Sequence, residues 1–136
     1  MQIAKKAIAN SIPQTGSTYV ANYQTAGRGR RQNKQWQAAP GTALLCSIIL
    51  PEAIFPTSPA PSITCSLAVA KVIEDYCKNK KVEIKWPNDI LIQGKKIAGI
   101  LCESYKKWII VGIGVNVNAH PDNKDINMPA TCISDY

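Results

Sequence analysis

The spacing of apolar residues predicts two helices in this chain. Residues 2–10 (QIAKKAIAN) form a short, lysine-bearing segment that is compatible with a helix. A longer helix is predicted over 62–79, with Ser62 as its N-cap, because apolar residues such as Leu67 and Ala70 recur there at intervals of three and four.

The other apolar stretches predict strands. Residues 42–50 (TALLCSIIL) form a nearly continuous apolar run, which is typical of a buried strand. Shorter or alternating runs predict further strands at 17–24, 82–86, 89–93, 96–103 and 108–117. Residues 51–61 contain four prolines and are predicted as a loop, and 119–136 is polar without a strong period. Without an internal repeat or a second core, residues 1–136 are expected to form a single domain.

Charge is distributed unevenly along the 136 residues. The formal net charge is +7, and six Lys or Arg residues precede Glu52, which is the first acidic residue. Such a basic, acid-free first third suits an anionic ligand or an acidic partner. Nucleic acid is the generic alternative, but no run of stacking aromatic residues is interleaved with the basic ones.

Composition limits the compartment. No apolar run approaches the roughly 20 residues of a membrane helix, and the first residues lack the apolar core of a secretory signal. The five cysteines are widely spaced and form no CxxC motif, so neither a zinc site nor a disulfide framework is indicated. We therefore expect reduced, buried thiols and a cytoplasmic location.

A glycine–arginine segment at 25–31 (TAGRGRR) is the first candidate site. Glycine allows close approach of the backbone to a ligand, and arginine supplies planar donors that suit carboxylate and phosphate. The segment therefore favours a loop that wraps an anion, although a solvated basic turn has the same composition.

The segment 85–89 (KWPND) is the second candidate. Pro87 sets a turn, after which Asn88 offers a carboxamide and Asp89 a carboxylate at the end of a strand. Asp89 could hold magnesium or a hydroxyl, and Asn88 could donate to phosphate. An Asx-turn that only reverses the chain is the alternative.

Two further strands carry candidate ligand contacts. Lys96 precedes the small pair Ala98-Gly99 and could direct its ammonium group at charge developing on a phosphate, although a solvated hairpin lysine is the simpler interpretation. Asn116 follows two glycines in an apolar strand and could bond a ligand from the sheet face, or cap the strand end.

Taken together, AGRGRR (26–31), KWPND (85–89), KIAGIL (96–101) and GIGVNVN (112–118) resemble the catalytic domain of biotin protein ligases. That resemblance implies an α+β fold with a mixed, largely antiparallel sheet flanked by helices, related to class II aminoacyl-tRNA synthetases and lipoate ligases. It also implies a reaction in which biotin and magnesium-ATP form biotinyl-5′-AMP, from which biotin passes to a lysine of a biotin carboxyl carrier protein.

The resemblance assigns roles to individual residues. Arg30, Lys96 and Asp89 would be catalytic, with Asp89 also the candidate ligand for Mg²⁺. Biotin would contact Gln24, Gly27, Arg28, Gly29, Arg30, Lys96 and Gly99. The nucleotide would contact Arg28, Arg31, Trp36, Asn88, Lys96 and Asn116, with Trp36 stacking on adenine.

The chain departs from the family pattern in two places. The family's biotin-binding Ser-Thr-Asn precedes its first helix, whereas Ser17-Thr18-Tyr19 follows the predicted helix here. The spacing from Arg31 to Trp36 is also slightly longer than usual. We therefore expect an incomplete catalytic domain without the DNA-binding domain or C-terminal barrel of some members, no specific DNA binding, no membrane association, and a homodimer as one possible assembly.

Three alternatives remain open from the sequence. A truncated module could bind biotin or its adenylate without turnover. A lipoate or octanoyl transferase would share the fold, although the GRGR and KWPND motifs argue against it. A small basic nucleic-acid binder is compatible with the acid-free first third.

Overall fold

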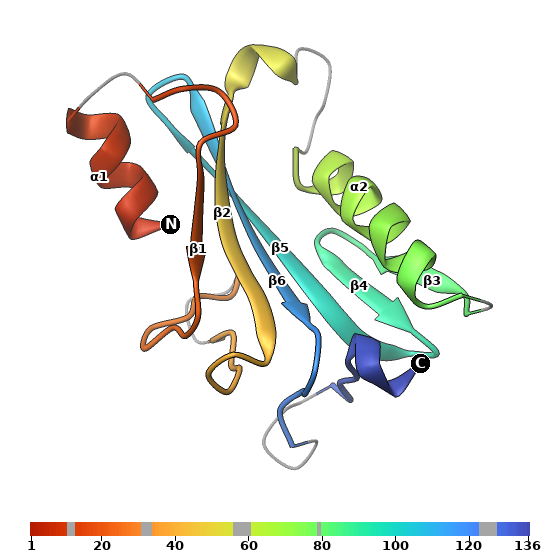
Figure 1. Ribbon diagram of the computed structural model, residues 1–136. Helices are drawn as coiled ribbons and strands as arrows, with labels where there is room; N and C mark the ends of the chain where they lie inside the picture. Colours follow the sequence, from red (N-terminus) through yellow and green to blue (C-terminus); the bar gives the residue numbers. More distant parts are fainter. Residues whose placement is uncertain (11–12, 31–33, 56–60, 79, 123–127) are drawn as a thin grey trace.

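Six strands form one antiparallel sheet between two helices (Figure 1). The computed structural model describes residues 1–10, 13–30, 34–55, 61–78, 80–122 and 128–136. The strand order is β1-β2-β6-β5-β4-β3, and all neighbouring strands run antiparallel. The predicted α+β class with a largely antiparallel sheet is confirmed.

The elements match most of the predicted segments, with boundaries shifted by a few residues. They are α1 (Gln2–Asn10), β1 (Thr18–Ala21), β2 (Ala43–Pro51), the 3-10 helix η1 (Glu52–Ile54), α2 (Pro61–Tyr76), β3 (Val82–Lys85), β4 (Asp89–Ile92), β5 (Lys95–Tyr105), β6 (Trp108–Asn116) and the 3-10 helix η2 (Ile133–Asp135). No helix among the described residues is both long and apolar enough to cross a membrane.

Helix α2 differs from its prediction in two respects. It begins at Pro61, so Ser62 lies inside the helix and is not its cap. Proline is well suited to the first helical position because its missing N–H would have no partner there. Leu67 is 58% exposed, whereas Ser66, Ala70 and Ile73 are buried. The helix therefore faces the sheet with the side that carries Ser66, Ala70 and Ile73, and this side is narrower than the predicted apolar face.

The two faces of the sheet carry separate cores. Against α2, the sheet contributes residues such as Ile90, Ile100 and Val111 to the larger cluster. On the opposite face, Ala4 and Ile8 of α1 pack on Ile49 and Ile110. Side chains alternate between the two faces along β6, so Gly112 and Gly114 lie on the same face as Ile110. This part of the second face extends beyond the residues that α1 covers.

One row of residues crosses the whole sheet on this second face. Strand pairing places one residue of each strand side by side, and alternate residues point to the same side. The row consists of Lys85, Asp89, Gly99, Gly114, Leu45 and Ala21, in order from β3 to β1. It unites KWPND, KIAGIL and GIGVNVN, which are far apart in the sequence.

Candidate functional site

Four predicted site residues meet over this row. The Lys96 Nζ atom donates to Asp89 Oδ1 at 2.7 Å, and the Asn88 side-chain amide donates to the same oxygen at 3.2 Å. Lys96 Nζ also lies 5.6 Å from the centroid of the Trp36 ring. The structure therefore brings a cation, a carboxylate, a carboxamide and an indole to one point beside Gly99.

Local structure directs Lys96 to this face. A tight turn with positive φ at Gln93 (52°) and Gly94 (75°) joins β4 to β5, as expected for a two-residue hairpin. The pairing of β4 and β5 shifts between Ile90 and Leu91. The segment near the C-terminus then fixes the backbone of Lys96, whose N–H donates to Pro129 O (2.7 Å) and whose carbonyl accepts from Thr131 N–H (3.0 Å).

Glycines in the row make room for Trp36. A Cβ atom at Gly114 would lie 2.6 Å from Trp36 Cε2, and one at Gly99 would lie 3.1 Å from Trp36 Cζ3. The indole therefore packs directly on the backbone of β6 and β5. These two glycines position a flat aromatic wall beside Lys96.

Adding a methyl group at Gly114 should dislodge this wall. We expect Gly114→Ala to lower the free energy of unfolding by about 1–3 kcal/mol, the usual cost of overpacking, as measured by urea denaturation. Gly112→Ala is the matched control on the same strand and face, because its Cβ would meet the flexible end of the Met1 side chain. Equal losses in the two variants would contradict the seating of Trp36 on Gly114.

The glycine–arginine loop folds back on the segment that leads to Trp36. Gly29 N–H donates to Lys34 O at 2.7 Å. Gly27 is buried against the carbonyl of Trp36 and lies beside the side chain of Gln24. Any side chain at Gly27 would collide with the backbone of Trp36. Glycine is therefore required where these two segments of the loop come close together.

The arginines of this loop are directed to different places. Arg28 Nη2 donates to Glu103 Oε2 at 3.0 Å, and Glu103 lies four residues along β5 from Gly99, about 13 Å. The Arg30 guanidinium instead lies 5.8 Å from the centroid of the Trp86 ring, next to KWPND. Arg31 lies outside the described residues.

Glu103 anchors both Arg28 and α1. Its Oε2 atom also accepts from Lys5 Nζ at 2.9 Å. Burial by itself would raise the pKa of Glu103, but the bonds from Lys5 and Arg28 outweigh that effect and hold its pKa below the ordinary 4.5. Folding therefore favours the charged carboxylate.

Stability should accordingly depend on Glu103 in acid. Because its pKa is lower in the folded state, its stabilising contribution is complete above about pH 4.5 and is lost as pH falls through the folded-state value. We expect the free energy of unfolding of the parent to fall more steeply below pH 4.5 than that of Glu103→Gln, as measured by urea denaturation at several pH values. Parallel curves for the two proteins would contradict this.

Asn116 is the last residue of β6 and is 2% exposed. Its side-chain amide donates to Thr131 O at 3.0 Å, which attaches the C-terminal segment to β6. Its Oδ1 atom and the Trp36 Nε1 atom are buried without a hydrogen-bond partner among the described residues. An acceptor and a donor are thus available for a polar ligand at this end of the site.

Sequence reasoning missed several residues of this face. Lys85 pairs with Asp89 across β3 and β4 and is exposed on the same side. Ser47 pairs with Gly112, and its Oγ accepts from the Met1 amino group at 2.9 Å. The available signal was the alternation along the strands, but it becomes informative only when the register is known.

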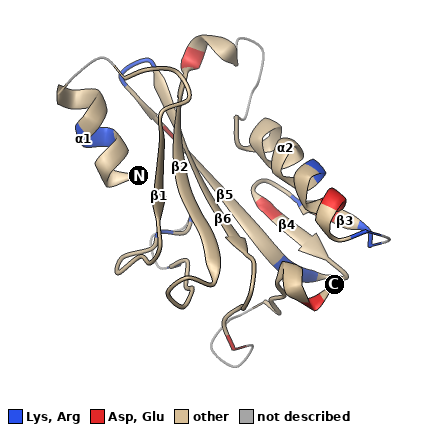
Figure 2. Cartoon of the chain, viewed as in Figure 1, with Lys and Arg blue, Asp and Glu red and all other residues tan. Residues whose placement is uncertain are grey.

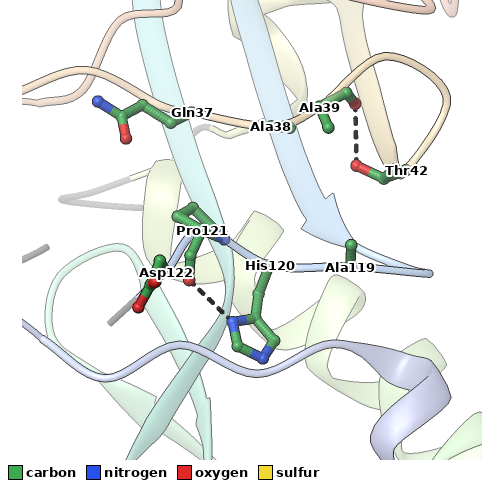
Figure 3. A pocket seen from close by; sticks show the side chains of 8 residues that line it. All are labelled: Gln37, Ala38, Ala39, Thr42, Ala119, His120, Pro121 and Asp122. Atoms are coloured by element: carbon green, nitrogen blue, oxygen red, sulfur yellow. Dashed lines mark hydrogen bonds between the residues drawn. The ribbon is translucent and has the colours of Figure 1, made fainter. Parts of the chain in front are cut away.

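A cavity of about 220 Å³ is lined in part by the residues that follow Trp36 in the sequence (Figure 3). The segment 37–42 forms one wall and 119–122 the other, and the His120 ring points away from 37–42 toward the C-terminal segment. His120 Nδ1 lies 2.9 Å from Pro121 O, and its Nε2 lies 3.8 Å from Asp135 Oδ2. Hydrogen bonds from Thr131 Oγ1 and the Cys132 N–H lower the pKa of Asp135, so this carboxylate stays charged.

Among the described residues, no group of three or more His, Cys, Asp or Glu side chains could by itself hold a metal ion. Asp89 alone offers a carboxylate in the row. Mg²⁺ commonly uses one or two carboxylates together with substrate phosphates, so the residues fit a metal that arrives with a nucleotide.

Comparison with known proteins places this geometry in a family. A profile described as the biotin/lipoate A/B protein ligase family matches residues 1–118. The bifunctional ligase/repressor BirA of Bacillus subtilis is 38% identical over 122 residues, which covers 85% of this chain and 37% of that protein. Biotin–protein ligase 2 of Arabidopsis thaliana is 37% identical over 134 residues, covering 92% of this chain and 38% of that protein.

Solved structures of biotin protein ligases have a similar fold. The biotin protein ligase of Leishmania major in complex with biotinyl-5-AMP superposes with a TM-score of 0.83 at 29% identity, over 98% of this chain and 59% of that one. The biotin protein ligase of Aquifex aeolicus with biotin and ATP gives 0.80 at 30% identity, over 96% and 55%. The chain thus spans little more than a third of the length of the first curated relatives.

Proposed function

Because the chain belongs to the biotin/lipoate A/B protein ligase family, we propose that it activates biotin with ATP and transfers it to a lysine of a biotin carboxyl carrier protein. The observation that carries this proposal is the meeting of Lys96, Asp89 and Trp36 over Gly99. Relatives whose names and structures concern biotin, ATP and biotinyl-5-AMP support it.

In the first step, a carboxylate oxygen of biotin attacks the α-phosphate of ATP and pyrophosphate leaves. Two anions must be held together, so positive charge is needed where they meet. Lys96 supplies it from the sheet, and Arg30 supplies it from the loop above Trp86. We place biotin beside Lys96 and Trp36, toward Gln24, Gly27 and Gly29 of the glycine–arginine loop, with Arg28 at its far end.

The nucleotide would lie on the other side of Trp36. The Trp36 Nε1 and Asn116 Oδ1 atoms, which have no hydrogen-bond partner in the described part of the chain, support this placement. The neighbouring cavity lined by Gln37 and His120 could receive part of the nucleoside. Asn88 would donate to phosphate from the start of β4. Mg²⁺ would come with the triphosphate and neutralise its charge, with Asp89 as the protein ligand.

In the second step, the neutral amine of the acceptor lysine attacks the acyl carbon of biotinyl-5′-AMP, the acyl–phosphate bond breaks, AMP leaves and the amine proton passes to solvent. We place the arriving lysine beside Asp89, the role that the family resemblance assigns to this residue. The described cysteines are all free thiols, which fits the reducing cytoplasm that we propose as the compartment. We expect no sequence-specific DNA binding, and a homodimer is an assembly to be tested by sedimentation.

Biotin activation can be tested without an acceptor protein. The chain is mixed with biotin, Mg²⁺ and ATP, and biotin-dependent pyrophosphate is measured together with biotin hydroxamate formed by added hydroxylamine. Both products should accumulate with time. Absence of both would overturn the proposed activity.

A second candidate is a module that binds biotin or its adenylate without turnover. It predicts saturable binding of biotinyl-5′-AMP in calorimetry, with no pyrophosphate released from ATP.

A further inference from the structure

The turn between β3 and β4 presents an unusual surface beside the site. Trp86 is 72% exposed, although it lies only three residues before Asp89. The Arg30 guanidinium lies over its ring, and Lys85 is exposed next to it on the row that contains Asp89. We call Arg30, Lys85 and Trp86 the Trp86 rim.

The rim has the composition of a binding surface. Tryptophan and arginine dominate the small groups of residues that supply most of the energy in protein interfaces. The described part of the chain leaves most of this indole uncovered, so a partner that covers it would bury a large apolar ring. Strand β3 is the last strand of the sheet as described, so a partner can approach from its open side (Figure 1).

Charge selects the kind of partner. Lys and Arg residues occur where β5 begins and at the end of β3 (Figure 2). Of the acidic groups near the rim, Asp89 is bonded to Lys96, and Glu83 is bonded to Lys81 at 2.6 Å. A target lysine is itself cationic and would be repelled by Arg30, Lys85 and Lys96 unless negative charge surrounds it.

We propose that the Trp86 rim is the docking surface for the acceptor protein, and that it binds an acidic face around the target lysine. This inference rests on the proposed function, because it names the surface used in the second step. The indole is covered by the acceptor, Lys85 pairs with acidic side chains beside the target lysine, and the lysine reaches Asp89 along the same row.

The test is direct binding, which requires neither ATP nor biotin. An unbiotinylated biotin carboxyl carrier domain is titrated with the chain, and its dissociation constant is followed by fluorescence anisotropy at low and at high salt. Trp86→Ala should weaken binding at least tenfold and Lys85→Gln severalfold, and salt should weaken the parent complex. Tyr76→Ala, which removes a ring that is 69% exposed on α2, and Lys71→Gln on the same helix are matched controls and should change binding less than twofold.

A second measurement separates docking from retention of the intermediate. Biotinyl-5′-AMP is supplied, and transfer to the carrier domain is divided by transfer to hydroxylamine in the same protein preparation. That ratio should fall at least tenfold in Trp86→Ala, because a small nucleophile needs no docking surface.

The proposal is overturned if the parent does not bind the carrier domain at about 1 mM, if rim and control variants weaken binding equally, or if the transfer ratio is unchanged. Failure to form hydroxamate from biotin and ATP would instead overturn the proposed activity, while carrier binding still reports on the rim.

Discussion

Lys96→Gln should reduce biotin-dependent pyrophosphate release about hundredfold, the usual effect of removing one preorganised charged donor. Lys96 Nζ is fixed by Asp89 at 2.7 Å and lies over the Trp36 ring, so its charge is already placed before the reaction begins. Because the charge that it meets grows as the biotin carboxylate attacks, kcat should fall more than the affinity for ATP. Steady-state kinetics with a pyrophosphate-coupled assay would measure both.

Lys95→Gln is the matched control for that experiment. Lys95 is exposed and begins β5, so it points to the opposite face from its neighbour. Both substitutions remove one positive charge from the same hairpin, but Lys95→Gln should leave pyrophosphate release nearly unchanged. Equal losses would mean that general electrostatics is responsible and that Lys96 has no specific role.

Arg30→Ala should release biotinyl-5′-AMP roughly ten- to hundredfold faster, corresponding to the loss of about 1.5–3 kcal/mol of charge-assisted bonding. Of the two arginines of this loop that the structure describes, Arg30 lies next to Trp86 of KWPND, whereas Arg28 is bonded to Glu103. The dissociation rate of radiolabelled adenylate, chased with unlabelled adenylate, would measure the change.

Lys34→Ala provides the comparison for Arg30. Lys34 is exposed in the same loop, and it holds Gly29 through its backbone carbonyl, which the substitution leaves in place. Its side-chain loss removes one positive charge without touching the Trp86 ring. An adenylate dissociation rate in Arg30→Ala that matches that of Lys34→Ala would remove Arg30 from the phosphate site.

Helices and strands follow local preferences, and their prediction was largely confirmed. The apolar run of β2 and the hairpin between β4 and β5 depend on neighbouring residues and on the turn between them. The resemblance drawn from four motifs is also confirmed by the family match. The individual contacts of the site residues with biotin and ATP stay predictions.

The failures involve contacts between distant parts of the chain. Residues 129–131 lacked a periodic signal, yet they pair with Lys96 and accept from Asn116. Helix α2 exposes Leu67 because the shape of the sheet decides which stripe of an apolar helix is buried. Neither outcome is encoded in a window of a few residues.

By itself, the sequence determined the elements, their order and the family, because each depends on short stretches whose residue types restrict the backbone. The tertiary structure decided how the motifs combine. It placed Lys85 in line with Asp89, seated Trp36 on Gly114, and sent Arg28 to Glu103 but Arg30 to Trp86. The alignment of Lys85 with Asp89 follows from strand register, in which a shift of one residue turns every side chain to the other face. The positions of Trp36, Arg28 and Arg30 follow from contacts between their loop and distant parts of the chain.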